Sequence, residues 1–190
     1  MNAWILNAKV ARPNGAFAFG HLHVAEGRVA GWHEGSEVPE AARAGGAAVI
    51  DARGRLLAPG FVDMHVHLRE PGFEHKEDIV TGTASAAKGG FTTVACMPNT
   101  KPPADSPDII RHIVRRAAEA GYVRVLPYAA ITKGQAGEEL ADFAALKEAG
   151  AIGFSDDGRG VQSAGMMKRA MELAASLGLP IGRASCRERV

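Results

Sequence analysis

The stretch FVDMHVHLR, residues 61–69, decides the fold, because an apolar run ends there in two histidines, His65 and His67. In a β-strand, residues i and i+2 lie on the same face about 6.5–7 Å apart, so the two imidazoles can converge on one metal ion. The alternative is a pair of ordinary histidines at a strand end, and the spacing alone does not separate the two interpretations. The residues that follow the pair distinguish a metal site from ordinary histidines.

From Phe61 onward, segments of strand length alternate with segments of helical period. We expect strands at 61–68, 92–97, 124–131 and 151–156, and helices at 76–88, 107–120, 138–149 and 163–177. Four βα units, about thirty residues apart, suit a doubly wound sheet or half of an eight-unit barrel. The turn after the first strand reads HLREPG, which is no glycine-rich phosphate loop. We therefore predict an α/β fold, the amino-terminal half of a (β/α)8 TIM-type barrel.

The clearest helix signals surround residues 107–120. Ser106 can cap the start of this helix, Pro107 suits its first turn, and Gly121 can end it in the left-handed conformation. Its apolar residues fall on one stripe, which predicts a helix packed against the sheet.

Residues 1–57 show another pattern, with short apolar runs separated by turn signals such as Pro13-Asn14-Gly15 and no sustained helical period. This pattern predicts a small β module of antiparallel strands. We therefore divide the chain into a β module at 1–57, a truncated half-barrel at 58–180 and a carboxyl-terminal segment at 181–190.

The composition is that of a soluble globular protein: 190 residues, 46% hydrophobic, 23% charged, with a net charge of +1. The absence of a basic excess argues against nucleic acid and anionic membranes as partners. We find neither a signal peptide nor a membrane span, so a cytoplasmic location is expected. Cys96 and Cys186 form no disulfide framework, and Cys96 is expected to be a buried strand residue.

In a barrel, functional side chains gather at the carboxyl ends of the strands. Four successive predicted strand ends carry such residues: His65, His67 and Arg69; Asn99; Tyr128 and Thr132; Asp156 and Asp157. Two imidazoles and a carboxylate suit zinc or a similar divalent ion, which lowers the pKa of bound water towards neutrality. Arg69 offers a planar fork for a substrate carboxylate, and Asn99 can bond both ends of an amide. The combination predicts hydrolysis of an amide in a small anionic molecule.

Each of these residues also has a plainer interpretation. Arg69 and Glu70 could form only a surface ion pair, and Asn99 could only stabilise a local turn. The run 156–158, Asp-Asp-Gly, could likewise be no more than a turn.

Other histidines are not expected to bind metal. His21 and His23 repeat the His-x-His spacing, but no carboxylate follows on a comparable strand end. His75 has no partner at ligand spacing, so we expect it to be solvated.

Three segments, in this order along the chain, resemble a known family: PGFVDMHVHLREPGFEHKEDIVTGTASAAKGGFTTVACMPNTKP, VRVLPYAAIT and GAIGFSDDGRGVQSAGMMKRAMELAASLGLP. The chain resembles the type I bacterial dihydroorotases of the amidohydrolase superfamily, over nearly everything up to Pro180. The resemblance implies a (β/α)8 TIM-type metallohydrolase barrel preceded by a small β-sandwich module, and a hydrolase of cyclic amides with one or two zinc ions per site. It would interconvert (S)-dihydroorotate and N-carbamoyl-L-aspartate in pyrimidine biosynthesis.

The resemblance also implies roles for individual residues. His65 and His67 would bind one zinc ion and Asp157 would bridge two, while His67, Arg69 and Asn99 would contact the substrate. Neighbours on a strand face opposite ways, so one of Asp156 and Asp157 enters the site; the family pattern favours Asp157. The general-base aspartate is expected beyond the chain end, so no catalytic residue is expected within the chain.

Two further interpretations remain open. Hydantoinases, dihydropyrimidinases and allantoinases resemble this chain but usually present a carbamylated lysine where it reads Ser-Asp-Asp-Gly. A non-catalytic dihydroorotase-like scaffold for aspartate transcarbamoylase is the other alternative, against which the intact His65, His67 and Asp157 argue.

The end of the chain departs from the family pattern. After Pro180 the family continues with a strand ending in a metal-binding histidine, whereas this chain reads IGRASCRERV with Ala184 at that place. The segment equals the translation of a common short-read sequencing adapter, which predicts that it is not native. With half the barrel missing, we expect the 190-residue chain to be inactive and poorly soluble, with the fourth strand as an exposed edge.

Overall fold

The computed structural model describes residues 2–182, which divide between two compact units, Met1–Pro59 and Gly60–Val190. The predicted tail lies outside the described residues except for Ile181 and Gly182, and the departure at Ala184 lies outside them altogether. Within residues 2–182, no helix is long and apolar enough to cross a membrane.

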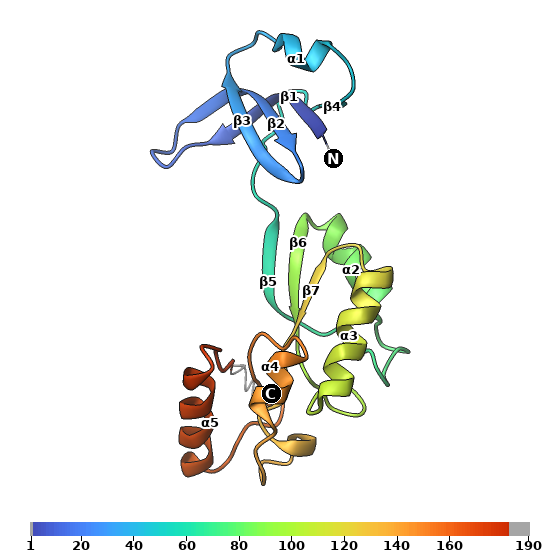
Figure 1. The fold of residues 1–190 in the computed structure, drawn as a ribbon, viewed down its shortest axis with the longest axis vertical. Coiled ribbons are helices and arrows are strands. Elements are labelled where there is room, and N and C mark those ends of the chain that lie inside the picture. Colours follow the sequence, from blue (N-terminus) through green and yellow to red (C-terminus); the bar gives the residue numbers. More distant parts are fainter. Residues whose placement is uncertain (1, 183–190) are drawn as a thin grey trace, which may run out of the picture. The chain divides into compact units, whose positions relative to one another are not determined.

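The amino-terminal unit is a four-stranded sheet in the order β3-β2-β1-β4 (Figure 1). Its elements are β1 (Asn2–Ala11), β2 (Phe17–Ala25), β3 (Arg28–Glu34), the short helix α1 (Glu40–Arg43) and β4 (Ala48–Asp51). The antiparallel expectation is correct for β1/β2 and β2/β3 but wrong for β4, which pairs with β1 in parallel. The long connection through α1 allows this, because it returns the chain to the end at which β1 starts.

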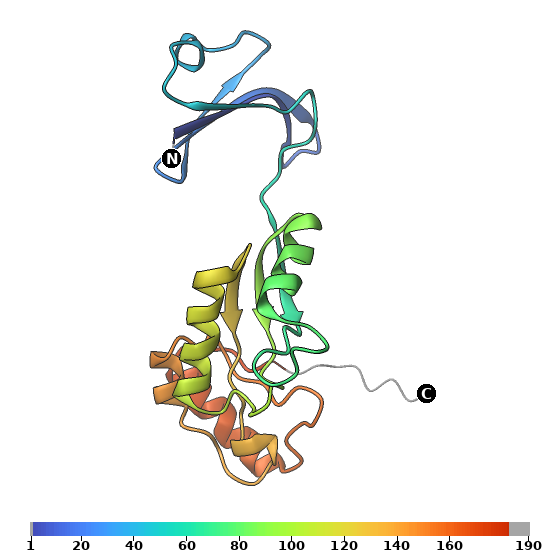
Figure 2. The same ribbon diagram turned by 90° about the vertical axis from the view of Figure 1, so that its right-hand side faces the viewer.

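The second unit begins with three parallel strands in the order β5-β6-β7. They are β5 (Phe61–Val66), β6 (Phe91–Cys96) and β7 (Arg124–Pro127), connected by α2 (Ile79–Lys88) and α3 (Pro107–Ala120). The two helices lie side by side on one face of this sheet (Figures 1 and 2). A doubly wound sheet has helices on both faces, whereas strands in sequential order with helices on one face form a barrel wall.

After β7 the chain continues through the 3-10 turn η1 (Lys133–Gln135) and the helices α4 (Phe143–Glu148) and α5 (Ala164–Ser176). The predicted fourth strand is not a regular strand; a single bridge joins Phe154 to Ala129, and another joins it to Ile181. The regular ladder stops there because the side chain of Asp156, rather than a backbone carbonyl, accepts the backbone N–H groups of Ile131 and Thr132.

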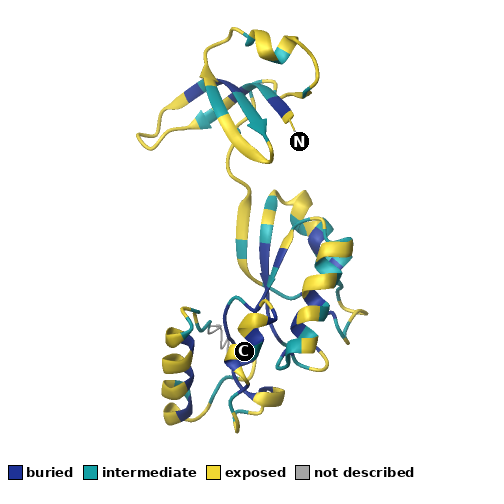
Figure 3. Cartoon of the chain, in the orientation of Figure 1, coloured by how far each residue is buried: buried dark blue, intermediate teal, exposed yellow. Residues whose placement is uncertain are grey.

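The exposed edge therefore differs from the one expected. Phe154 has a neighbour on each side, whereas β5 is largely exposed (Figure 3), with Phe61, Val62 and Met64 each more than half accessible. An apolar edge strand of this kind is a template for association with other chains.

The core of the second unit lies between the sheet and its helices. It contains Ile79 of α2, Val94 of β6, Ile110 and Ile113 of α3, and Leu146 of α4, all almost fully buried. Each such side chain stabilises the fold by about 1.5–3 kcal/mol. This packing fixes the strand ends from which the functional side chains project.

The ends of α3 show how packing overrides local signals. The helix covers the predicted residues, but the side chain of Ser106 makes no capping hydrogen bond, and Gly121 is extended with φ −76° rather than left-handed. A Cβ atom at Gly121 would lie 2.5 Å from the carbonyl oxygen of Ala117. Glycine is needed here because the chain passes close to the helix on its way into β7.

Candidate metal centre

His65 and His67 lie where β5 ends. His65 belongs to the strand and His67 follows its last residue, and the pairing of β5 with β6 is irregular between Asp63 and Val66. The backbone N–H of His65 donates to the Asp63 carboxylate, 3.0 Å away, rather than to the neighbouring strand. An irregularity of this kind re-aims side chains at a strand end.

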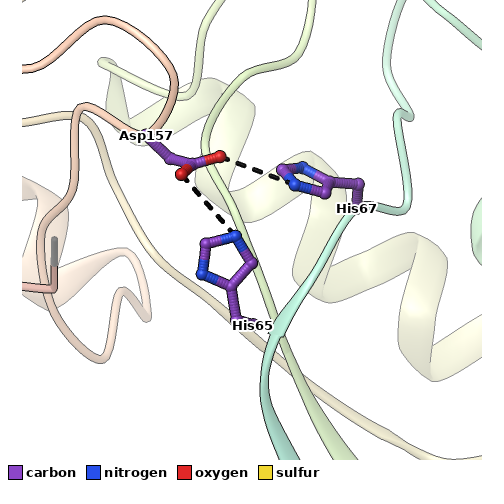
Figure 4. Close-up of side chains that lie close together, drawn as sticks. All are labelled: His65, His67 and Asp157. Carbon is purple, nitrogen blue, oxygen red and sulfur yellow. Dashed lines mark ion pairs between the residues drawn. The ribbon is translucent and has the colours of Figure 1, made fainter. Parts of the chain in front are cut away.

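Asp157 joins the two histidines from a distant part of the chain (Figure 4). The Nε2 atom of His65 lies 3.6 Å from Oδ1 of Asp157, and Nε2 of His67 lies 3.5 Å from Oδ2. Ligand atoms of all three residues lie within 4.8 Å of one another. The carboxylate is nearly buried, at 7% side-chain exposure, while the imidazoles are partly open at 42% and 30%.

These separations fit a zinc ion. Ligand atoms about 2.1 Å from a tetrahedral zinc ion lie about 3.4 Å apart. The two imidazole-to-carboxylate distances, 3.5 and 3.6 Å, are close to that value and long for a hydrogen bond. Two imidazoles and a carboxylate are also ligand types that zinc accepts, so the residues present fit this ion.

The neighbouring aspartates point to different places. Asp156 is buried and accepts from the N–H of Ile131 at 2.8 Å, from the N–H of Thr132 at 3.2 Å and from the Thr132 hydroxyl. Its carbonyl oxygen also accepts from the N–H of Gly160, so the segment is a turn as well. Asp156 is thus a structural anchor that fixes the backbone from which Asp157 reaches the imidazoles.

Asn99, which follows β6, contacts both sides of the cluster. Its Oδ1 atom lies 2.9 Å from Nδ1 of His67, and its Nδ2 donates to Oδ2 of Asp157 at 3.1 Å. Asn99 therefore does more than stabilise its own turn.

Arg69 lies two residues beyond His67 in a half-buried position, with a positive φ of 60°. The interpretation of Arg69 and Glu70 as a surface pair is wrong. Glu70 is buried; its carboxylate accepts from Nε of Arg116 at 2.7 Å and from the N–H of Ile79 at 3.0 Å. This contact raises the pKa of Arg116. Glu70 thereby ties the loop that carries Arg69 to α2 and α3.

Sequence reasoning missed the role of Glu70. Arg116 stands 46 positions away in the chain, on a helix whose facing residues become known only once the helix is packed. The sequence did contain one signal. His112 and Arg116 stand four residues apart on α3 and so share one face of the helix, and His112 also lies 3.9 Å from the Glu70 carboxylate.

The other residues considered in the sequence make structural contacts or lie exposed. Tyr128 is buried against Gly153, and Thr132 is buried where it holds Asp156. Cys96 is a buried strand residue, as predicted, and burial raises the pKa of its thiol to about 12. His75 is exposed, as predicted.

Among the described residues, no carboxylate pairs with the other two histidines, His21 and His23. His21 is fully buried in β2, and its Nδ1 accepts from the N–H of Asn7 at 3.1 Å. His23 stacks on Trp4, with ring centroids 4.3 Å apart. Within residues 2–182, His65, His67 and Asp157 are the one group of three or more potential ligands arranged to hold a metal ion.

Comparison with known proteins identifies the family. The chain matches the family model described as Dihydro-orotase-like over residues 54–187. The chain belongs to the dihydro-orotase-like family. It is 54% identical over 181 residues to a Dihydroorotase from Geobacillus thermodenitrificans (strain NG80-2), an alignment covering 95% of this chain and 41% of that protein. It is 51% identical over 183 residues to a Dihydroorotase from Bacillus caldolyticus, with the same coverage. The chain thus spans about two fifths of the length of these relatives.

Two solved structures share the fold of this family member. The chain superposes on an L-hydantoinase from Arthrobacter aurescens with a TM-score of 0.79 and 24% identity, covering 96% of this chain and 40% of that one. An enamidase, described as a member of the amidohydrolase superfamily, gives a TM-score of 0.70 at 22% identity, covering 98% of this chain and 52% of that one. The fold is that of the amino-terminal part of a TIM-type metallohydrolase, as predicted.

Proposed function

We propose that the full-length protein containing this chain is a zinc-dependent dihydroorotase of the cytoplasm, acting in pyrimidine biosynthesis. It would reversibly open the ring of (S)-dihydroorotate to N-carbamoyl-L-aspartate. The observation that carries the proposal is the convergence of His65, His67 and Asp157 at strand ends, in a chain of the dihydro-orotase-like family. Relatives named Dihydroorotase at 51–54% identity support the choice of reaction.

The metal-binding part of the proposal concerns three side chains. Nε2 of His65, Nε2 of His67 and the carboxylate of Asp157 would hold the zinc ion. When bound, zinc supplies Lewis-acid activation of water and of an amide carbonyl near neutral pH. The near-complete burial of the Asp157 carboxylate supports this assignment, because it strengthens attraction to a cation.

Arg69 would bind the substrate carboxylate. Its guanidinium is permanently charged and presents parallel N–H donors that match a carboxylate. No ion pair joins Arg69 to any residue in the described part of the chain, whereas the adjacent Glu70 is already paired with Arg116. The loop therefore carries an arginine two residues beyond His67 that is not already held by a carboxylate of the described residues.

In the forward direction, water adds across the ring amide. A carbon–oxygen bond forms at the carbonyl carbon, the carbon–nitrogen bond breaks, and the departing nitrogen takes up a proton. Arg69 would orient the ring, and His67 and Asn99 would also contact the substrate. The family resemblance implies an aspartate as proton carrier, and we assign this role to none of the residues described.

The test uses the full-length protein with matched substrates. Dihydroorotate and dihydrouracil differ by the carboxylate that Arg69 would bind, so zinc-loaded enzyme should strongly prefer dihydroorotate and lose activity to a chelator. Arg69→Met should lower kcat/KM for dihydroorotate by about 10–100-fold, as expected for losing a charged hydrogen-bonded pair, and leave dihydrouracil turnover unchanged.

Arg111→Met is the matched control, because Arg111 is an exposed arginine of α3 paired only with Asp108. It should leave both substrates unaffected. A preference for dihydrouracil would instead support a hydantoinase-like activity. A full-length protein that binds no zinc and turns over neither substrate would support the scaffold for aspartate transcarbamoylase.

A further inference from the structure

Asn99 uses both ends of its side-chain amide within the candidate metal centre. One end lies 3.1 Å from Oδ2 of Asp157 and the other 2.9 Å from Nδ1 of His67. An ionised carboxylate accepts hydrogen bonds and donates none, so the end facing Asp157 must be the NH2 group. The carbonyl oxygen of Asn99 therefore faces His67.

This orientation determines the tautomer of His67. Because the Asn99 oxygen only accepts, Nδ1 of His67 must carry the hydrogen. A neutral imidazole protonated at Nδ1 has its lone pair on Nε2, which is the atom facing Asp157 at 3.5 Å. Asn99 thus presents the ligand atom of His67 and fixes one oxygen of Asp157 at the same time.

The backbone around Asn99 is well held. The N–H of Thr100 donates to the carbonyl of Pro98, and the N–H of Lys101 donates to the carbonyl of Pro71, both at 2.9 Å. The second bond links the loop after β6 to the loop after β5. These backbone hydrogen bonds hold the side-chain amide of Asn99 in position in the absence of a metal ion.

We infer that Asn99 is a positioning residue for the metal centre, which fixes His67 in its ligand tautomer and aims the Asp157 carboxylate. This role is separate from the substrate contact that the family resemblance implies, and it rests on the proposed zinc site. The two imidazoles differ in this respect: Asn99 contacts His67, and no such partner of His65 lies within residues 2–182. Losing a residue that orients metal ligands costs about 10–100-fold in metal affinity.

The experiment measures zinc affinity of the full-length protein without substrate, by competition with a chelator. Asn99→Ala should weaken zinc binding about 10–100-fold, and the exposed control Arg111→Met should not. Unchanged zinc affinity in Asn99→Ala, with only KM raised, would overturn the inference. So would a wild-type protein that holds no zinc.

A second measurement includes a test on the wild-type protein alone, which needs no variant to fold. In the metal-free wild-type protein, nitrogen NMR of labelled histidines should show His67 protonated at Nδ1, and Asn99→Ala should populate both tautomers. A wild-type His67 protonated at Nε2 would refute the proposed orientation. If the protein binds zinc as described but leaves dihydroorotate intact, the proposed function fails while the role of Asn99 stands.

Discussion

The chain contains two His-x-His pairs that have the same spacing in the sequence but different contacts in the structure. His21 and His23 lie within β2, where each ring already has a partner: the N–H of Asn7 for the first and the indole of Trp4 for the second. His65 and His67 lie at the end of β5, where their Nε2 atoms face Asp157.

The difference teaches that spacing is the weaker part of a metal-site signal. Alternation along a strand places both rings of each pair on one face, whatever the strand does next. In the second unit, the end of β5 lies beside the ends of other parallel strand segments, and the third ligand, Asp157, comes from one of these. In the mixed amino-terminal sheet, the rings of His21 and His23 instead contact Asn7 and Trp4 of β1, the antiparallel neighbour of β2.

The largest expected effect comes from His67→Ala, and the equivalent substitution in the other pair, His23→Ala, serves as its control. His67→Ala in the full-length protein should lower bound zinc and reduce turnover of dihydroorotate by more than about 100-fold, the upper limit for changes outside the ligand set. His23→Ala should leave zinc content and turnover unchanged. Metal analysis and a dihydroorotate assay check both, and equal effects of the two variants would remove the distinction.

A smaller effect separates the adjacent aspartates. Asp156→Asn should lower the free energy of unfolding of the second unit by about 2 kcal/mol, because its three buried hydrogen bonds lose their charge. Zinc affinity should stay within about threefold if the fold survives. Asp157→Asn should give the reverse, with weakened zinc binding and unchanged stability of the metal-free protein. Urea unfolding and chelator competition measure the two quantities, and the idea fails if the variants behave alike.

His21→Ala tests whether this histidine is a structural residue. The substitution leaves the N–H of Asn7 without its buried acceptor, which should destabilise the amino-terminal unit by about 2 kcal/mol. Hydrogen exchange of the β1 and β2 amides should accelerate accordingly, while zinc content stays the same. Loss of zinc without faster exchange would show that the first pair has a metal-binding role after all.

The smallest expected effect concerns the stacked ring of His23. His23→Ala removes its contact with Trp4 and should cost about 1 kcal/mol. His23→Phe, which keeps an aromatic ring, should restore most of that loss in the same exchange measurement. No recovery with phenylalanine would indicate that the hydrogen bond to Asn2, rather than the stack, stabilises this position.

The sequence predicted what depends on local pattern. The strands at β5, β6 and β7 follow from apolar runs bounded by turns, and α3 follows from its stripe of isoleucines. His65 and His67 are indicated by their places at a predicted strand end, and Asp157 is preferred to Asp156 through the family resemblance. The structure brings these three residues, His65, His67 and Asp157, together.

What the sequence did not predict depends on distant partners. The parallel pairing of β4, the extended Gly121 and the irregular fourth segment are decided by residues far along the chain or by packing. The two hydrogen bonds of Asn99 are of the same kind, since they join residues 32 and 58 positions apart.

The ties of Glu70 to Arg116 and Ile79 have a consequence for evolvability. They anchor the stem of a rim loop whose tip, Glu74 to Lys76, is exposed. Exposed loop tips accept substitutions and insertions, while an anchored stem keeps its geometry. Substitutions at this tip are therefore expected to leave the backbone of Arg69 in place.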